Sequence, residues 1–92
     1  MKIVSIKKVE DCFDGSTIFG YEFDQAWSHE AIMQLETLGT VEYFAQFPKP
    51  FFRAIGREGL IVKGVEGEPT CRAIYPRRNK EATKAEFERI FE

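Results

Sequence analysis

Residues 51–75 read FFRAIGREGLIVKGVEGEPTCRAIY, three runs of β-forming residues separated by two turns that contain glycine. The runs cover residues 51–55, 60–65 and 70–75, and the turns are predicted at residues 56–59 and 66–67. Connections this short join antiparallel neighbours, because a parallel pair needs a crossover of about a dozen residues or more. The stretch therefore predicts a three-stranded antiparallel meander.

Further strands are predicted on the N-terminal side of this meander. Residues 40–47 are rich in β-branched and aromatic residues, and Pro48 and Pro50 end the run because neither can donate a ladder hydrogen bond. Residues 3–13 and 17–23 predict a first hairpin, with Asp14-Gly15 as a two-residue type I′ turn. In the register that this turn sets, alternate residues share one buried face, namely Val4, Ile6, Cys12, Phe19, Tyr21 and Phe23.

Two helices are predicted as well. Ser28 is a good N-cap for a helix over residues 29–38, and Gly39 is placed to end it. A second helix follows the last strand, with Asn79 or Thr83 as its N-cap. Its apolar stripe consists of Phe87, Ile90 and Phe91.

The order of these elements, ββ-α-ββββ-α, lacks the strict alternation of strand and helix that a parallel sheet requires. We therefore predict an α+β fold, a two-layer sandwich with a mainly antiparallel sheet and both helices packed on one face. A length of 92 residues fits a single domain, residues 1–92. With 43% hydrophobic and 30% charged residues, the composition is that of an ordinary globular protein.

The sequence predicts a cytoplasmic protein. No run approaches the roughly 20 apolar residues of a membrane span. Lys2, Lys7 and Lys8 interrupt what would have to be the apolar core of a signal peptide. Cys12 and Cys71 lie outside any Cys-x-x-Cys spacing, so we interpret them as small buried hydrophobic residues.

The residues needed for common chemistries are scarce. Structural zinc takes about four Cys or His ligands. The chain has one His and two Cys, so no metal and no cofactor are predicted. His29 opens a predicted helix and is interpreted as a solvated surface residue, which leaves no nucleophile and base in an evident pair. No glycine-rich phosphate-binding motif occurs either. The sequence favours a protein that is not an enzyme.

Charge is distributed unevenly along the chain. Residues 1–46 hold three Lys and no Arg against eight acidic residues, a net charge of −5. Residues 47–92 hold ten Lys or Arg against seven acidic residues, a net charge of +3. If the two halves are separate in space, the molecule is a dipole that steers charged partners, whereas interleaved strands would cancel the separation.

Aromatic and basic residues lie close together around residues 47–53. A register that pairs Ala54 with Ile61 places Phe52 on the same face as two basic residues of the following strands. An aromatic ring flanked by basic side chains on a sheet is typical of single-stranded nucleic-acid binding, and the alternative is an ordinary solvated face. The candidate binding residues are Phe52, Lys63 and Arg72, extended by Arg77 and Arg78.

Three functions are compatible with these features. The favoured one is a small non-enzymatic interaction or regulatory module that binds a protein partner or pairs with itself as a homodimer, because small sheets leave free edge strands. The second is a small-ligand site between sheet and helices, lined by Trp27, Tyr43 or Tyr75 and an arginine. The third is single-stranded nucleic-acid binding, which the net charge of −2 disfavours.

Overall fold

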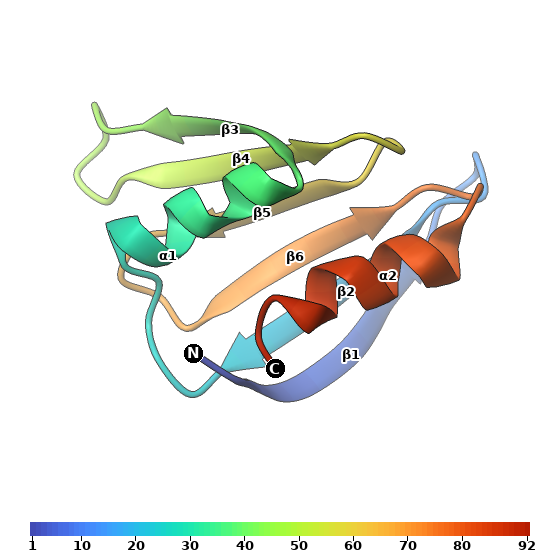
Figure 1. The fold of residues 1–92 in the computed structure, drawn as a ribbon, viewed down its shortest axis with the longest axis horizontal. Helices are drawn as coiled ribbons and strands as arrows, with labels where there is room; N and C mark the ends of the chain where they lie inside the picture. Colours follow the sequence, from blue (N-terminus) through green and yellow to red (C-terminus); the bar gives the residue numbers. More distant parts are fainter.

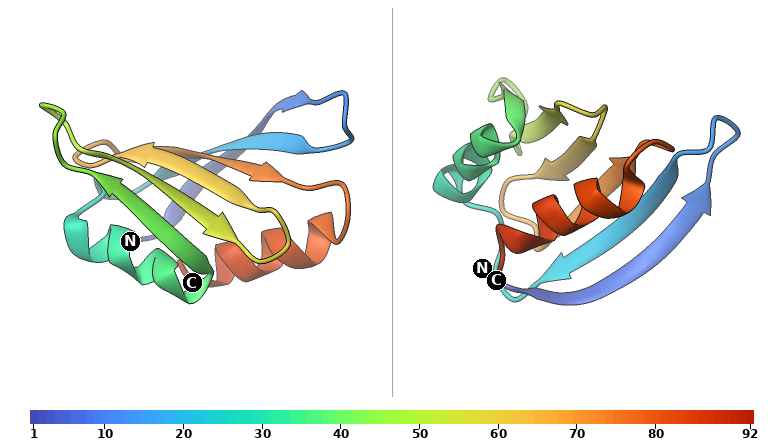
Figure 2. Two further views of the ribbon diagram at one scale, coloured as in Figure 1. Left: turned by 90° about the horizontal axis from the view of Figure 1, so that it is seen from above. Right: turned by 45° about the vertical axis from the view of Figure 1, so that its right-hand side comes forward.

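The computed structural model describes residues 1–92 and contains one six-stranded antiparallel sheet with both helices on one face (Figure 1). The elements are β1 (Ile3–Asp11), β2 (Thr17–Phe23), α1 (His29–Met33), the 3-10 helix η1 (Gln34–Thr37), β3 (Gly39–Phe44), β4 (Phe51–Gly56), β5 (Ile61–Val65), β6 (Thr70–Tyr75) and α2 (Lys80–Arg89). The strand order is β1-β2-β6-β5-β4-β3. Seen along the sheet, strands and helices form two layers (Figure 2, left). The predicted α+β sandwich is confirmed.

The meander has the predicted strands but a different register between β4 and β5. The amide of Gly56 donates to the Leu60 carbonyl at 2.8 Å, and Gly59 has a φ of +91°, so the loop holds three residues. This pairing sets Ala54 opposite Val62, where the sequence-based register had Ile61. A slip of one residue moves every side chain of a strand to the opposite face.

The first hairpin also turns differently from the prediction. A type I′ turn needs positive φ at both central residues, and only Gly15 has it, with a φ of +90°. The loop is Phe13–Gly15, closed by the amide of Cys12 donating to the Ser16 carbonyl at 2.8 Å. Asp14 stabilises the loop by accepting from the hydroxyl and the amide of Ser16, which lower the pKa of its carboxyl. Asp11 therefore faces Thr17, and two irregularities interrupt β1.

Both helices begin close to the predicted residues. The Ser28 hydroxyl caps α1 by accepting from the Ala31 amide at 3.1 Å, and α1 continues into η1, so that together they cover most of residues 29–38. Asn79 occupies the N-cap position of α2 but its side chain makes no capping bond. Thr83 is not the cap; its hydroxyl donates to the Asn79 carbonyl at 2.8 Å from within the first turn.

Aromatic rings dominate the core between the sheet and the helices. Trp27, Phe52 and Phe87 are almost completely buried, as are the two tyrosines that face α2 from β2 and β6. The Tyr75 and Tyr21 hydroxyls lie 2.6 Å apart, and the Tyr21 hydroxyl donates to Glu88 of α2 at 2.7 Å. Large rings fill a small core efficiently, which accounts for the high aromatic content.

The acidic and basic halves of the sequence interleave in the sheet. Strands β4, β5 and β6 come from the basic half and form its centre. Strands β1 and β2 flank them on one side and β3 on the other, all from the acidic half. The two halves are therefore not two separate poles. No helix has the length and apolar character needed to cross a membrane.

Candidate functional site

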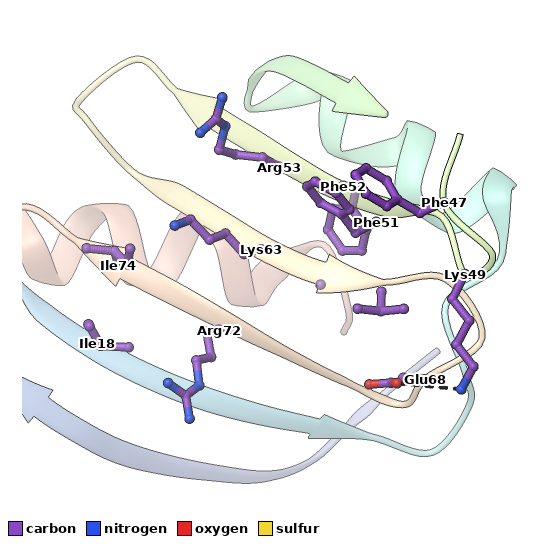
Figure 3. Close-up of a pocket in the computed structure, with 12 residues that line it drawn as sticks. Ile18, Phe47, Lys49, Phe51, Phe52, Arg53, Lys63, Glu68, Arg72 and Ile74 are labelled. Atoms are coloured by element: carbon purple, nitrogen blue, oxygen red, sulfur yellow. Dashed lines mark ion pairs between the residues drawn. The ribbon is translucent and has the colours of Figure 1, made fainter. Parts of the chain in front are cut away.

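The face of the sheet opposite the helices, here called the open face, carries a row of residues that is charged on five of the six strands. One residue from each strand stands at the same register position. From β3 to β1 these are Glu42, Arg53, Lys63, Arg72, Gly20 and Lys7, and we call them the basic row. Figure 3 shows the side chains of Arg53, Lys63 and Arg72 on three neighbouring strands. Four cations and one carboxylate give the row a net charge of +3 in a chain whose net charge is −2.

Most of this positive charge is not neutralised within the chain. Arg53 is the exception, because its Nε donates to Glu42 Oε1 at 2.6 Å. Lys7, Lys63 and Arg72 make no ion pair. Moreover, Lys63 stands directly opposite Arg72 in the β5–β6 ladder. Like charges in that position destabilise a sheet by about 0.2–1 kcal/mol per pair.

Apolar residues border the basic row on both sides. The isoleucine row crosses four strands and consists of Ile55, Ile61, Ile74 and Ile18. On the opposite side lies the phenylalanine row, Phe44, Phe51 and Val65, to which Phe47 adds its ring from the β3–β4 connection. The outer face of an antiparallel sheet is ordinarily polar. Contiguous apolar residues on such a face are a common feature of binding surfaces.

The phenylalanine side of the face is ordered by ring contacts. The Phe44 and Phe51 rings are stacked, with centroids 4.4 Å apart and planes inclined at 19°. The Phe47 ring lies 5.0 Å from Phe51 at 47° and is 46% exposed. These contacts hold one aromatic surface beside the basic row.

The open face is hollowed along the basic row. A hollow of about 860 Å³ is bordered by Phe47 and Phe51 at one end and by Ile18 and Ile74 at the other (Figure 3). A second hollow of about 450 Å³ reaches Ser5 and Lys7 on β1. The two share five lining residues, Lys63, Gly64, Val65, Glu68 and Arg72. The two hollows are therefore neighbours on the open face, and together we call them the trough.

The structure places the side chains of two of the five predicted binding residues together on the open face. Lys63 and Arg72 are exposed neighbours at the centre of the trough. Arg77 and Arg78 follow β6 and lie outside the trough, where the aliphatic part of Arg77 packs over Gly15.

Phe52 is among the residues that line the larger hollow, but its side chain does not share the open face with Lys63 and Arg72 as predicted. Its side chain is completely buried on the helix side, where its ring centroid lies 4.8 Å from that of Trp27. The cause is the register of β4, in which Ala54 faces Val62. Phe51 takes the position on the open face that was expected for Phe52. The glycine spacing of the β4–β5 turn, Gly56 to Gly59, was the available signal for the three-residue loop.

The aromatic residues expected around a ligand between sheet and helices are engaged in packing. Trp27 and Tyr75 are at most 1% exposed, and the Trp27 indole donates to the Thr70 carbonyl at 3.0 Å. The Tyr43 hydroxyl donates to Glu66 at 2.7 Å, a bond that raises the pKa of that tyrosine. The His29 ring packs edge-on against Tyr43, with centroids 4.8 Å apart. Trp27 and Tyr75 therefore occupy space between the layers themselves.

The cysteines differ in their surroundings. Burial raises the pKa of the Cys71 thiol, so this side chain remains a neutral, small hydrophobic residue. Cys12 is half-buried next to the first hairpin loop. No cluster of three or more His, Cys, Asp and Glu side chains is positioned to hold a metal ion.

No family model, no curated protein and no solved structure matches this chain.

Proposed function

We propose that the chain is a non-enzymatic binding module whose trough holds an extended, anionic partner. The observation that carries this proposal is the pairing of Lys63 with Arg72, two cations that face each other with no carboxylate to neutralise either. This arrangement destabilises the free protein. A negatively charged chain lying along the trough would turn the same two residues into binding contacts.

The shape of the trough supports an extended partner. The basic row crosses six strands, about 24 Å at 4.7–4.9 Å per strand spacing. The two hollows lie next to each other along this row, share five lining residues and are bordered in part by apolar residues. A chain-like partner could contact the cations along its length and bury apolar groups against either flank.

A second copy of this chain fits the open face poorly. If two open faces stacked about a two-fold axis through the basic row, Lys63 and Arg72 would meet the same cations of the other copy. Such an interface places like charges opposite each other. We therefore assign the open face to a different partner.

Self-association has better support at the β1 edge of the sheet. β1 is a nine-residue edge strand, and its Val4, Ile6 and Val9 are 59%, 43% and 40% exposed. A long edge strand with exposed apolar side chains offers unpaired backbone groups to another strand. As a second candidate function, we propose that β1 pairs with β1 of another copy in a homodimer.

The binding proposal can be tested with two flexible anionic chains, a fluorescein-labelled 12-residue polyglutamate and a labelled 12-nucleotide oligothymidylate. Fluorescence anisotropy in 50 mM salt should show that at least one binds. The double variant Lys63→Gln/Arg72→Gln should lose this binding. The matched control Arg77→Gln/Arg78→Gln removes the same charge outside the trough and should retain it. Equal losses in both variants, or no binding of either chain, would contradict the proposal.

A further inference from the structure

We infer that the extended anionic partner is a single-stranded nucleic acid, one of whose bases stacks on the aromatic surface of Phe47 and Phe51. This inference rests on the proposed function, because it names the kind of chain that the trough holds. Its additional support comes from the phenylalanine row and from the position of that row relative to the cations.

The aromatic surface lies directly beside the cations on the same strands. Phe51 and Arg53 are two residues apart on β4, and both point to the open face. Two residues of a strand span about 6.6 Å. Val65 and Lys63 have the same relationship on β5. A phosphate on the basic row therefore leaves its attached base over the phenylalanine row.

The rings themselves are suited to a planar, polar-edged partner. Stacking of Phe44 on Phe51 holds the Phe51 ring in place, and Phe47 stands beside it half exposed. Bases stack on such rings whatever their sequence, while their edges stay in contact with water. An acidic peptide would use the cations equally well but would gain nothing specific from an aromatic ring.

The strand must be single because the aromatic surface can only reach an unpaired base. In a duplex the faces of the bases are occupied by their neighbours in the stack, and proteins read base edges in the grooves instead. The rings of Phe47 and Phe51 offer faces and no hydrogen-bonding groups. The inference therefore predicts a preference for single strands over a duplex of the same length.

The test compares Phe51→Leu with Phe13→Leu in anisotropy titrations of the labelled oligothymidylate. Leucine keeps an apolar side chain but removes the aromatic face, so Phe51→Leu should weaken binding about tenfold, within the range of one lost stacking contact. Phe13 is fully exposed in the first hairpin loop, outside the trough, and its replacement should have no effect. An unlabelled duplex of the same length should compete poorly with the labelled single strand.

Two results would separate the failure of this inference from that of the proposed function. If polyglutamate binds as tightly as oligothymidylate and Phe51→Leu changes neither, the partner is not a nucleic acid, while the anionic binding module stands. If neither chain binds the wild type, both proposals fail. If Phe51→Leu does not fold, NMR spectra of the backbone amides of the wild type replace it. Added oligothymidylate should shift the amide signals of Phe51, Lys63 and Arg72. Shifts confined to the helices would overturn the inference.

Discussion

At the scale of single residues, the central observation is that Lys63 and Arg72 stand opposite each other on adjacent strands without a neutralising carboxylate. Their repulsion destabilises the free sheet, and a bound anionic partner would relieve it. Stability and binding are therefore expected to respond in opposite directions when one of the two charges is removed.

Arg72→Thr should stabilise the free protein by about 0.5 kcal/mol while weakening its binding to polyanions, since it removes the like-charge pair and keeps a good strand former. Urea unfolding measures the first effect and anisotropy the second. Arg78→Thr, outside the trough, serves as the control and should change neither. Loss of stability in Arg72→Thr would show that the arginine is held by favourable contacts instead.

A second prediction at this scale concerns the hydroxyl pair beneath α2. The Tyr21 hydroxyl links the buried Tyr75 hydroxyl to Glu88, with distances of 2.6 and 2.7 Å. Tyr21→Phe leaves the Tyr75 hydroxyl buried without a partner, which should cost about 1–3 kcal/mol in the free energy of unfolding.

The double variant Tyr21→Phe/Tyr75→Phe provides the decisive comparison for this pair. It removes both buried hydroxyls, so it should be more stable than Tyr21→Phe alone. Urea unfolding of the three proteins measures this difference. If the double variant is the less stable of the two, the cost lies in packing and not in an unpaired hydroxyl.

At the scale of secondary-structure elements, the free edge of β1 makes self-association testable. Light scattering on the eluting protein should show a dimer whose population rises with concentration and does not weaken with salt, because the proposed contacts are backbone hydrogen bonds and the apolar side chains of Val4, Ile6 and Val9. Val4→Lys should give a monomer. Thr40→Lys places the same charge on β3 at the opposite edge and should leave the dimer intact. A monomeric wild type at every concentration would end this proposal.

The elements themselves were largely predictable from local sequence. Glycine-containing turns and β-branched runs located the strands, and Ser28 located the start of the first helix. The face to which each β4 side chain points was harder to predict. One residue more or less in the Gly56–Gly59 loop decides whether Phe51 or Phe52 faces outward. Lys63 and Arg72 were correctly predicted to share a face of the sheet, because the error in register left their side chains pointing to the same side.

The remainder of the basic row depends on contacts that local patterns do not encode. Lys7 and Gly20 join the row because β2 pairs with β6, a strand about fifty residues further along the chain. Nothing in either strand specifies that partner; the pairing follows from how the hairpin and the meander share one core. The two halves of the chain interleave for the same reason, so the charge of each half could not be assigned to a region of the surface.

At the scale of the whole molecule, the central positive trough in an acidic protein predicts strong salt dependence. Lys7, Lys63 and Arg72 make no ion pair within the chain. Release of counterions by three phosphate contacts to a single strand gives a slope of about −2 in a plot of log K against log salt. Affinity for oligothymidylate should therefore fall roughly twentyfold between 50 and 200 mM salt.

Anisotropy titrations at several salt concentrations measure that slope. Arg77→Gln/Arg78→Gln should preserve it, because these arginines lie outside the trough. An affinity that does not change with salt would show that the apolar rows, and not the cations, hold the partner.

The pairing of β2 with β6 also has a consequence for the order in which the sheet assembles. The hairpin β1–β2 and the run of strands from β3 to β6 each join strands that are adjacent in sequence, whereas Thr17 meets Tyr75 only after that whole run of strands. Such distant contacts form slowly, because closing a long loop costs entropy before the contact is made.

We therefore expect the β2–β6 ladder to close after the transition state of folding. In stopped-flow kinetics, Ile18→Ala should accelerate unfolding and leave the folding rate nearly unchanged, whereas slower folding would place this ladder in the nucleus. During synthesis, one edge of β2 would then remain unpaired until β6, the last strand of the sheet, has left the ribosome.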